Sequence, residues 1–132
     1  MKHYGKATDA NQKQIIADLR KIGVQVLDLS GTGEGCPDLL TTFNHTCVLL
    51  EIKTEEKDVD FKRGQLETFA TWTNYIGFAR NFDEAEKVCK QPSQFALSGT
   101  EKLKLREWLI RNPKQETLAV NKFLKIIGRM ER

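Results

Sequence analysis

Apolar residues in the first part of the chain follow a helical spacing and then a strand spacing. Between Asp9 and Gly23 they recur at three- and four-residue intervals, as Ile15, Ile16, Leu19 and Ile22. We expect Asp9 to cap this helix, with Gln12 three residues later, and Gly23 to end it. Residues 24–30 then alternate apolar and polar side chains, which predicts a strand.

Two further strands are predicted at residues 38–43 and 46–53, and the second is apolar almost throughout, as in strands covered on both faces. Asn44 and His45 lie between them, and both residue types tolerate the positive φ of a tight hairpin turn. A turn centred there fixes the register unless an odd loop or a bulge intervenes. The predicted partners, counted outward, are Phe43 with Thr46, Thr42 with Cys47, Leu40 with Leu49, and Asp38 with Glu51.

The chain then predicts a helix over residues 61–74, a short strand over 76–79 and a second helix that opens at Asn81 and runs through Lys90. The polar and acidic residues 54–60 connect it to the preceding strand. Residues 1–90 therefore predict an α/β domain with a mixed sheet, in the order α-βββ-α-β-α.

Residues 91–132 differ in character from the rest. Helices are expected near 100–110 and 116–130, with Asn112-Pro113 between them, which predicts a helical hairpin; a helix-turn-helix and a dimer contact are the alternatives. This extension holds nine Lys and Arg against four Asp and Glu, whereas residues 1–90 hold twelve against fourteen. A basic segment attracts phosphates regardless of sequence, although a solvated helix face explains the same charge.

Composition excludes several classes of protein. A length of 132 residues fits one compact domain with a short appendage, and 39% hydrophobic with 30% charged residues excludes disordered and collagen-like chains. No apolar run approaches the ~18 residues of a membrane span, and the polar N-terminus lacks a signal peptide's apolar segment. We therefore expect a cytoplasmic protein without a membrane partner. Three cysteines without a CxxC pair predict reduced thiols.

The predicted hairpin brings candidate chemistry together at one end. It opposes the carboxylates of Asp38 and Glu51, and like charges at such a position need a compensating group such as a divalent cation. Lys53 shares the face of Glu51, while Ile52 points to the opposite layer and offers only its carbonyl. All-oxygen ligands suit Mg²⁺ or Mn²⁺, which activate water for phosphodiester hydrolysis. The alternative is an ion pair of Lys53 with either carboxylate at a solvated edge.

Pro37-Asp38 followed by Glu51-Ile52-Lys53 resembles the signature of the PD-(D/E)XK nuclease superfamily. With their surroundings, these residues look like the stand-alone VRR-NUC domain proteins of bacteria and phages, over about residues 8–90. The further residues that carry this resemblance are Asn11-Gln12, Leu19-Arg20, Gly23, Gly35-Cys36, Leu39-Leu40, Leu49-Leu50, Gln65 and Trp72.

This resemblance implies a restriction-endonuclease-like fold and a Mg²⁺- or Mn²⁺-dependent endonuclease that hydrolyses DNA, plausibly branched or flapped, as a homodimer. It makes Asp38 and Glu51 metal ligands assisted by the Ile52 carbonyl, Lys53 the catalytic lysine, and Gln65 a catalytic-site residue. Gln65 otherwise reads as an ordinary exposed helix residue. Substrate contacts are expected from the glycine-rich loop and the neighbouring helices: Asn11, Gly33, Gly35, Lys62 and Arg63.

The chain also departs from the family pattern. The literal Val-Arg-Arg is absent, and Phe61-Lys62-Arg63-Gly64 replaces the usual Leu-Thr-Pro-Ala. Many superfamily members carry a glutamate on the first helix, where this chain offers Asn11, with Asp18 two turns further on. These departures keep a second function open, a non-catalytic nucleic-acid-binding or regulatory module of the same fold. The intact Asp38, Glu51 and Lys53 favour the nuclease.

Two other features have competing interpretations. The glycine-rich loop at residues 31–37 lacks the Gly-Lys-Ser/Thr ending of a nucleotide-binding P-loop, so it predicts either a close approach to a DNA phosphate or a flexible turn. The acidic run of Glu55, Glu56, Asp58 and Asp60 predicts a solvated loop, with a further metal site as the alternative.

Overall fold

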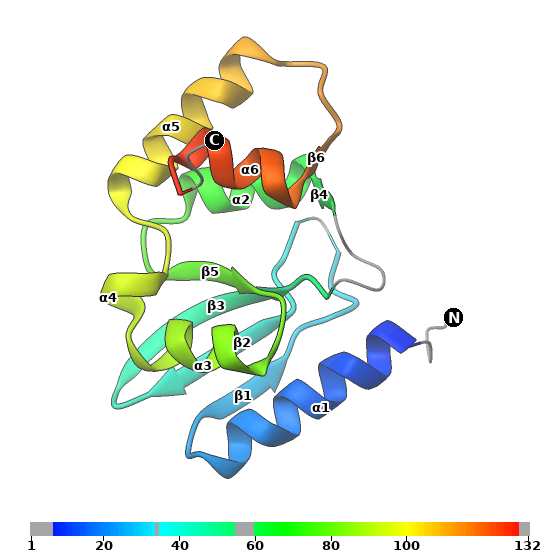
Figure 1. Cartoon of the computed structure of the whole chain (residues 1–132), viewed down its shortest axis with the longest axis vertical. Helices are drawn as coiled ribbons and strands as arrows, with labels where there is room; N and C mark the ends of the chain where they lie inside the picture. The colour runs from blue at the N-terminus through cyan, green and yellow to red at the C-terminus, as the bar shows by residue number, and fades with distance from the viewer. Residues whose placement is uncertain (1–6, 34, 55–59, 130–132) are drawn as a thin grey trace.

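The structure is a computed structural model (Figure 1) that describes residues 7–33, 35–54 and 60–129. Its helices and strands follow one another as α1 (Ala7–Lys21), β1 (Gln25–Asp28), β2 (Leu39–Phe43), β3 (Thr46–Ile52), β4 (Asp60–Lys62), α2 (Arg63–Thr71), β5 (Ile76–Ala79), α3 (Phe82–Lys90), α4 (Pro92–Phe95), α5 (Gly99–Arg111), β6 (Thr117–Ala119) and α6 (Val120–Ile127).

The main sheet has the strand order β1-β2-β3-β5, and a separate two-stranded sheet pairs β4 with β6. Strands β1, β2 and β3 pair antiparallel, whereas β3 and β5 pair parallel. The predicted α/β class with a mixed sheet is therefore confirmed. The hairpin is also as predicted, because Asn44 and His45 have φ of 55° and 66°, and the pairs from Leu39 with Leu50 to Phe43 with Thr46 follow the expected register.

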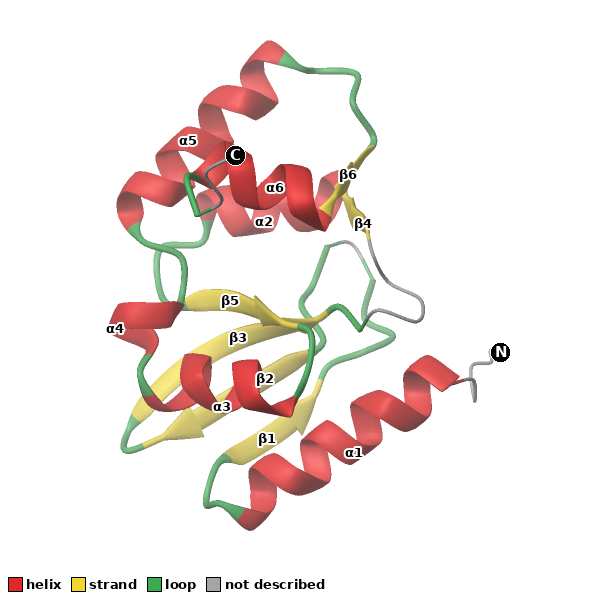
Figure 2. Ribbon diagram, in the orientation of Figure 1, coloured by secondary structure: helices red, strands yellow, loops and turns green. Residues whose placement is uncertain are grey.

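Helices cover the two faces of this sheet in separate layers, as Figure 2 shows. On one face α1 and α3 pack on the strands through a cluster that contains Leu19, Leu39, Leu50, Ile52 and Val88. On the other face α2, α5 and α6 pack over β3 and β5. The alternation of β3 between these two clusters places Ile52 in one layer and the side chains of Glu51 and Lys53 toward the other.

The C-terminal extension shares its core with the preceding residues. Phe123 of α6 lies 4.6 Å from Phe61 of β4 and 5.6 Å from Phe78 of β5, measured between ring centroids. The guanidinium of Arg63 also donates to the carbonyl oxygens of Leu109, Asn112 and Gln115 at the end of α5. Burying aromatic rings against one another stabilises both segments together, so residues 91–129 are packed into the same structure.

Three expectations about element ends were wrong. Helix α1 already includes Ala7, so Asp9 lies inside it and does not cap it. The helices expected to begin near residues 61 and 116 begin instead at Arg63 and Val120, after the short strands β4 and β6. Those strands pair Phe61 with Leu118, both buried, and three-residue strands are too short to leave a periodic signal in the sequence.

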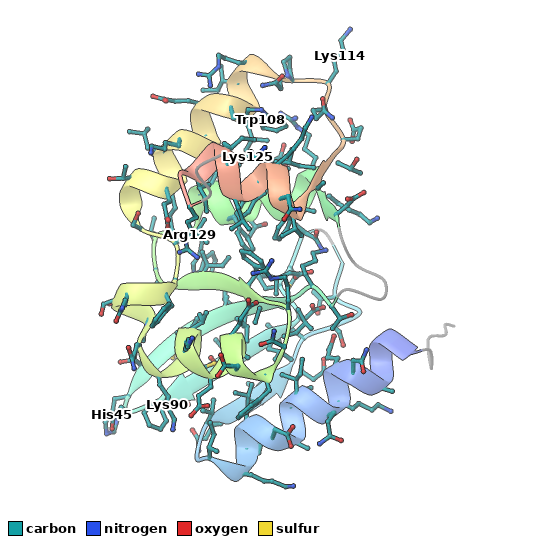
Figure 3. The ribbon with its side chains drawn as sticks, viewed as in Figure 1. His45, Lys90, Trp108, Lys114, Lys125 and Arg129 are labelled. Carbon is teal, nitrogen blue, oxygen red and sulfur yellow. The ribbon has the colours of Figure 1, made fainter. Side chains whose placement is uncertain are left out.

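Much of the basic excess of residues 91–132 serves the fold. Lys102 donates to the carbonyl oxygens of Trp72 and Asn74, and Arg106 to that of Ala70, where α2 ends. Burial, followed by the neighbouring Arg106, lowers the pKa of Lys102. Arg129 binds Glu101 and joins α5 to the end of α4 (Figure 3). These cationic side chains donate hydrogen bonds to backbone carbonyl oxygens near helix ends, where positive charge is stabilising.

Candidate active site

The candidate site lies at the end of β3, where the strand runs parallel to β5 and the backbone N–H of Lys53 still donates to the carbonyl of Ala79. Glu51 and Lys53 are both 4% exposed, although each carries a charged side chain. Their carboxylate and ammonium lie 3.4 Å apart. The alternative of an ion pair at a solvated edge is wrong about the environment, because Lys53 and Glu51 do form an ion pair but both residues are buried. Burying two charges is unfavourable unless further hydrogen bonds satisfy them.

Gln65 supplies those hydrogen bonds from the first turn of α2. Its Nε2 donates to Glu51 Oε2 at 2.9 Å, and its Oε1 accepts from Lys53 Nζ at 3.1 Å. The same Oε1 accepts from the backbone N–H of Lys62 at 2.9 Å, which caps the helix. One amide therefore fixes the start of α2 and spans both charged groups, so the interpretation of Gln65 as an ordinary exposed residue is wrong.

Lys53 is held in place by two further contacts. Its Nζ donates to the backbone carbonyl of Asp60 at 2.9 Å, and it lies 5.2 Å from the centroid of the Phe61 ring. An ammonium over an aromatic ring is attracted by the ring's negative face. The side chain of Lys53 is thus positioned by β4, which the sequence pattern did not reveal.

Asp38 approaches β3 from the start of β2. Its Oδ2 accepts the backbone N–H of Ile52 at 2.9 Å. The last pair in the β2–β3 ladder is Leu39 with Leu50, so the predicted pairing of Asp38 with Glu51 lies one step beyond the paired residues. The hydrogen bond to Ile52 keeps the Asp38 carboxylate at this end of the strand.

A cleft of about 620 Å³ opens between the glycine-rich loop and α2. Five predicted site residues line it, namely Asp38, Gln65, Gly33, Gly35 and the exposed Lys62, whereas Glu51 and Lys53 are not among its lining residues. Glu67, Thr68 and Thr71 of α2 also line it. No sequence pattern predicted these three, because their place depends on the way that α2 packs.

Gly35 brings the loop into direct contact with α2. Its φ is +79°, and a Cβ at this position would collide with the carbonyl oxygen of Gly64. The loop therefore approaches the helix backbone closely at Gly35, whereas the expected approach to a DNA phosphate stays a prediction. The flexible-turn alternative does not fit Gly35, because both its φ and its contact require glycine.

Two other predicted substrate contacts lie elsewhere. Arg63 is occupied by the three carbonyl oxygens at the end of α5 and by Glu67, with which it forms an ion pair at 3.3 Å. These contacts give Arg63 a structural role in joining α2 to the end of α5. Asn11 lies half-buried on α1 and does not line the cleft.

The chemistry of the donor set is consistent with a hard divalent cation. Asp38, Glu51 and the Ile52 carbonyl are oxygen donors, and Mg²⁺ is commonly held by one or two carboxylates, with water and substrate phosphates completing its shell. Within residues 7–33, 35–54 and 60–129, no three His, Cys, Asp or Glu side chains are grouped as metal ligands. Of the acidic run, Glu55, Glu56 and Asp58 lie outside the described residues.

No protein family model matches the chain, and no curated protein matches it. Among the described helices, none combines the length and apolar character that a membrane span requires.

Proposed function

We propose that this protein is a metal-dependent nuclease that hydrolyses phosphodiester bonds in DNA. The observation that carries the proposal is the buried network of Glu51, Lys53 and Gln65, with Asp38 beside it, at the edge of an open cleft. A buried charged pair adds little stability compared with apolar residues of similar volume, so its presence next to a cleft points to chemistry.

The order of elements supports the same proposal. Helix α1, the three antiparallel strands, helix α2, strand β5 and helix α3 follow the order expected of a restriction-endonuclease-like core, with β4 as a short addition. The resemblance to VRR-NUC proteins therefore remains part of the proposal. On it, the protein acts on branched or flapped DNA as a homodimer in the cytoplasm.

Each residue has a role in the proposed reaction. Asp38, Glu51 and the Ile52 carbonyl hold Mg²⁺ or Mn²⁺, which supplies charge stabilisation and an acidified water when bound. Lys53 directs its ammonium toward the same site and stabilises negative charge on the phosphate oxygens. Gln65 keeps Lys53 and Glu51 in register, and Lys62 attracts the DNA backbone at the cleft wall.

Cleavage of a labelled DNA panel tests the proposal. The panel contains single-stranded, duplex, flap and four-way-junction DNA, each incubated with Mg²⁺, Mn²⁺ or EDTA. We expect cleavage only with metal, and a loss of at least about 100-fold in Glu51→Gln. Glu86→Gln is the matched control, because Glu86 pairs with Lys90 on α3, on the opposite face of the sheet. Equal cleavage by both variants would contradict the assigned site.

The second candidate is a non-catalytic nucleic-acid-binding or regulatory module of the same fold. The observation in its favour is that the described residues offer two carboxylates at the site and no third acidic ligand. This candidate predicts binding of the DNA panel without cleavage in any metal, and binding that Glu51→Gln leaves unchanged. The same panel, read by gel shift in EDTA, therefore separates the two functions.

A further inference from the structure

A second cavity lies on the side of Lys53 that the cleft does not reach. It measures about 260 Å³ and is lined by Lys53, Thr54, Asp60, Arg80, Ala119, Val120 and Asn121. Arg80 directly follows β5, Thr54 lies two residues after the end of the parallel strand β3, and the carboxyl ends of parallel strands are the usual position for ligands in α/β folds. The opposite wall is the beginning of α6, which Figure 1 places beside β4 and β6.

Two features of this cavity could serve a ligand. The hydroxyl of Thr54, a residue only 4% exposed, is buried and has no hydrogen-bond partner among the residues that the structure describes. Helix α6 begins after Ala119, whose φ of −64° and ψ of 148° suit a capping residue, yet its methyl group gives no capping hydrogen bond. A buried hydroxyl without a partner is rare, and an uncapped helix start presents backbone N–H groups and a positive dipole end.

The charges around the cavity are mixed and largely paired. Lys53 and Arg80 line it, but Lys53 forms an ion pair with Glu51 at 3.4 Å, and Arg80 is held by hydrogen bonds of 3.1 and 2.8 Å to Glu84. Asp60 is the acidic residue that lines the cavity, and it is exposed. Hydroxyl, helix N–H groups and cations together are the donors that bind a phosphate group.

From these contacts we propose that the cavity is a phosphate-binding subsite formed by Thr54 and the first turn of α6. The inference rests on the proposed nuclease function in one respect: the phosphate then belongs to the nucleic acid strand and is not the one cleaved. Free inorganic phosphate shares the same chemistry. On this inference the C-terminal extension, through α6, forms part of the substrate site.

Titration of the full-length protein with inorganic phosphate in EDTA, followed by amide NMR, tests the subsite without any cleavage. We expect the backbone N–H signals of Thr54, Val120 and Asn121 to shift with phosphate. The variant Ala119→Asp places a carboxylate at the capping position, where it competes with phosphate while it stabilises the helix. It should raise the melting temperature and weaken phosphate binding at least tenfold. Wild-type affinity in this variant would overturn the proposal.

Two further variants separate binding from folding. Thr54→Val removes a hydroxyl that has no partner, so it should keep the melting temperature and weaken phosphate binding about threefold or more. Thr46→Val is the control at the start of β3, where the hydroxyl donates to the Asn44 carbonyl at 3.5 Å, and it should bind phosphate as the wild type does. Asp60→Asn should strengthen binding, because it removes the negative charge that lines the cavity. Equal affinity in Thr54→Val and Thr46→Val would contradict the subsite.

Oligonucleotides with a 5′-phosphate, a 3′-phosphate or neither distinguish the source of the phosphate. If the subsite serves the DNA strand, Ala119→Asp weakens binding of these oligonucleotides in EDTA as well as that of inorganic phosphate. Competition by inorganic phosphate alone identifies a free-anion site. If phosphate causes no shifts in a protein that still cleaves DNA, the subsite is overturned and the nuclease proposal stands. If phosphate causes shifts but the protein cleaves no DNA, the subsite stands and the nuclease proposal is overturned.

Discussion

The two ends of β3 are held in place by different kinds of contact. At its start the strand leaves a two-residue turn, in which Asn44 and His45 adopt positive φ and the pairing partners are close in sequence. At its end, Lys53 contacts the carbonyl of Asp60 and the amide of Gln65, which arrive from β4 and α2. The turn is exposed and the site is buried. Local backbone preference therefore sets one end, and tertiary packing sets the other.

The largest effect is expected at the buried end. Lys53→Met leaves the Glu51 carboxylate without its ion partner, so the free energy of unfolding should fall by about 3–5 kcal/mol in urea denaturation. The double variant Glu51→Gln with Lys53→Met removes both charges and should be destabilised less than Lys53→Met alone. A double variant whose loss equals the sum of the two single losses would show that the pair is not coupled.

The contact between the glycine-rich loop and α2 gives the next effect. Gly35→Ala combines an unfavourable positive φ with a collision against the Gly64 carbonyl, and should lower the free energy of unfolding by about 2–4 kcal/mol. Gly33→Ala is the matched control, because Gly33 has a φ of +80° but nothing within 4 Å of an added Cβ. Its loss should be about 1 kcal/mol. Equal losses in thermal denaturation would argue against the close contact.

A smaller and opposite effect is expected at the turn. His45→Gly places glycine at a position where positive φ is unfavourable for other residues, so the free energy of unfolding should rise by about 1 kcal/mol or less. Asn44→Ala should lower it by a similar amount. Neither variant should alter DNA cleavage or binding, because the turn lies at the opposite end of β3 from the site. A change in cleavage by either variant would show that the turn and the site at the other end of β3 are not independent.

The smallest effect depends on pH and concerns the carboxyl group of Glu84, which forms an ion pair with Arg80. Burial raises the pKa of Glu84, but hydrogen bonds and charge from Arg80, with a contribution from Lys87, outweigh it and leave the pKa lowered. A lowered carboxyl pKa stabilises the fold at neutral pH, and this stability is lost as the pH falls through the folded-state pKa. The advantage of wild type over Glu84→Gln should therefore be below about 1 kcal/mol at pH 7 and vanish in acid. A constant difference from neutral to acidic pH would contradict this linkage.

Much of the sheet is predictable because its signals are local. The spacing of apolar residues located β3 and β5, and the turn residues Asn44 and His45 fixed the β2–β3 register. The candidate residues Asp38, Glu51 and Lys53 followed from that register by counting. Strand β6 and the true start of α6 were missed, because the pairing of Leu118 with Phe61 joins segments far apart in the sequence.

The sequence by itself determined which residues lie at the end of β3, because strand alternation and turn geometry act over a few residues. Only the tertiary structure decided that Glu51 and Lys53 are buried, that Gln65 spans them, and that Arg63 serves the end of α5. Burial and hydrogen bonding depend on which distant segments pack together. That packing is the summed result of many apolar contacts, which cannot be predicted from a local pattern of residues.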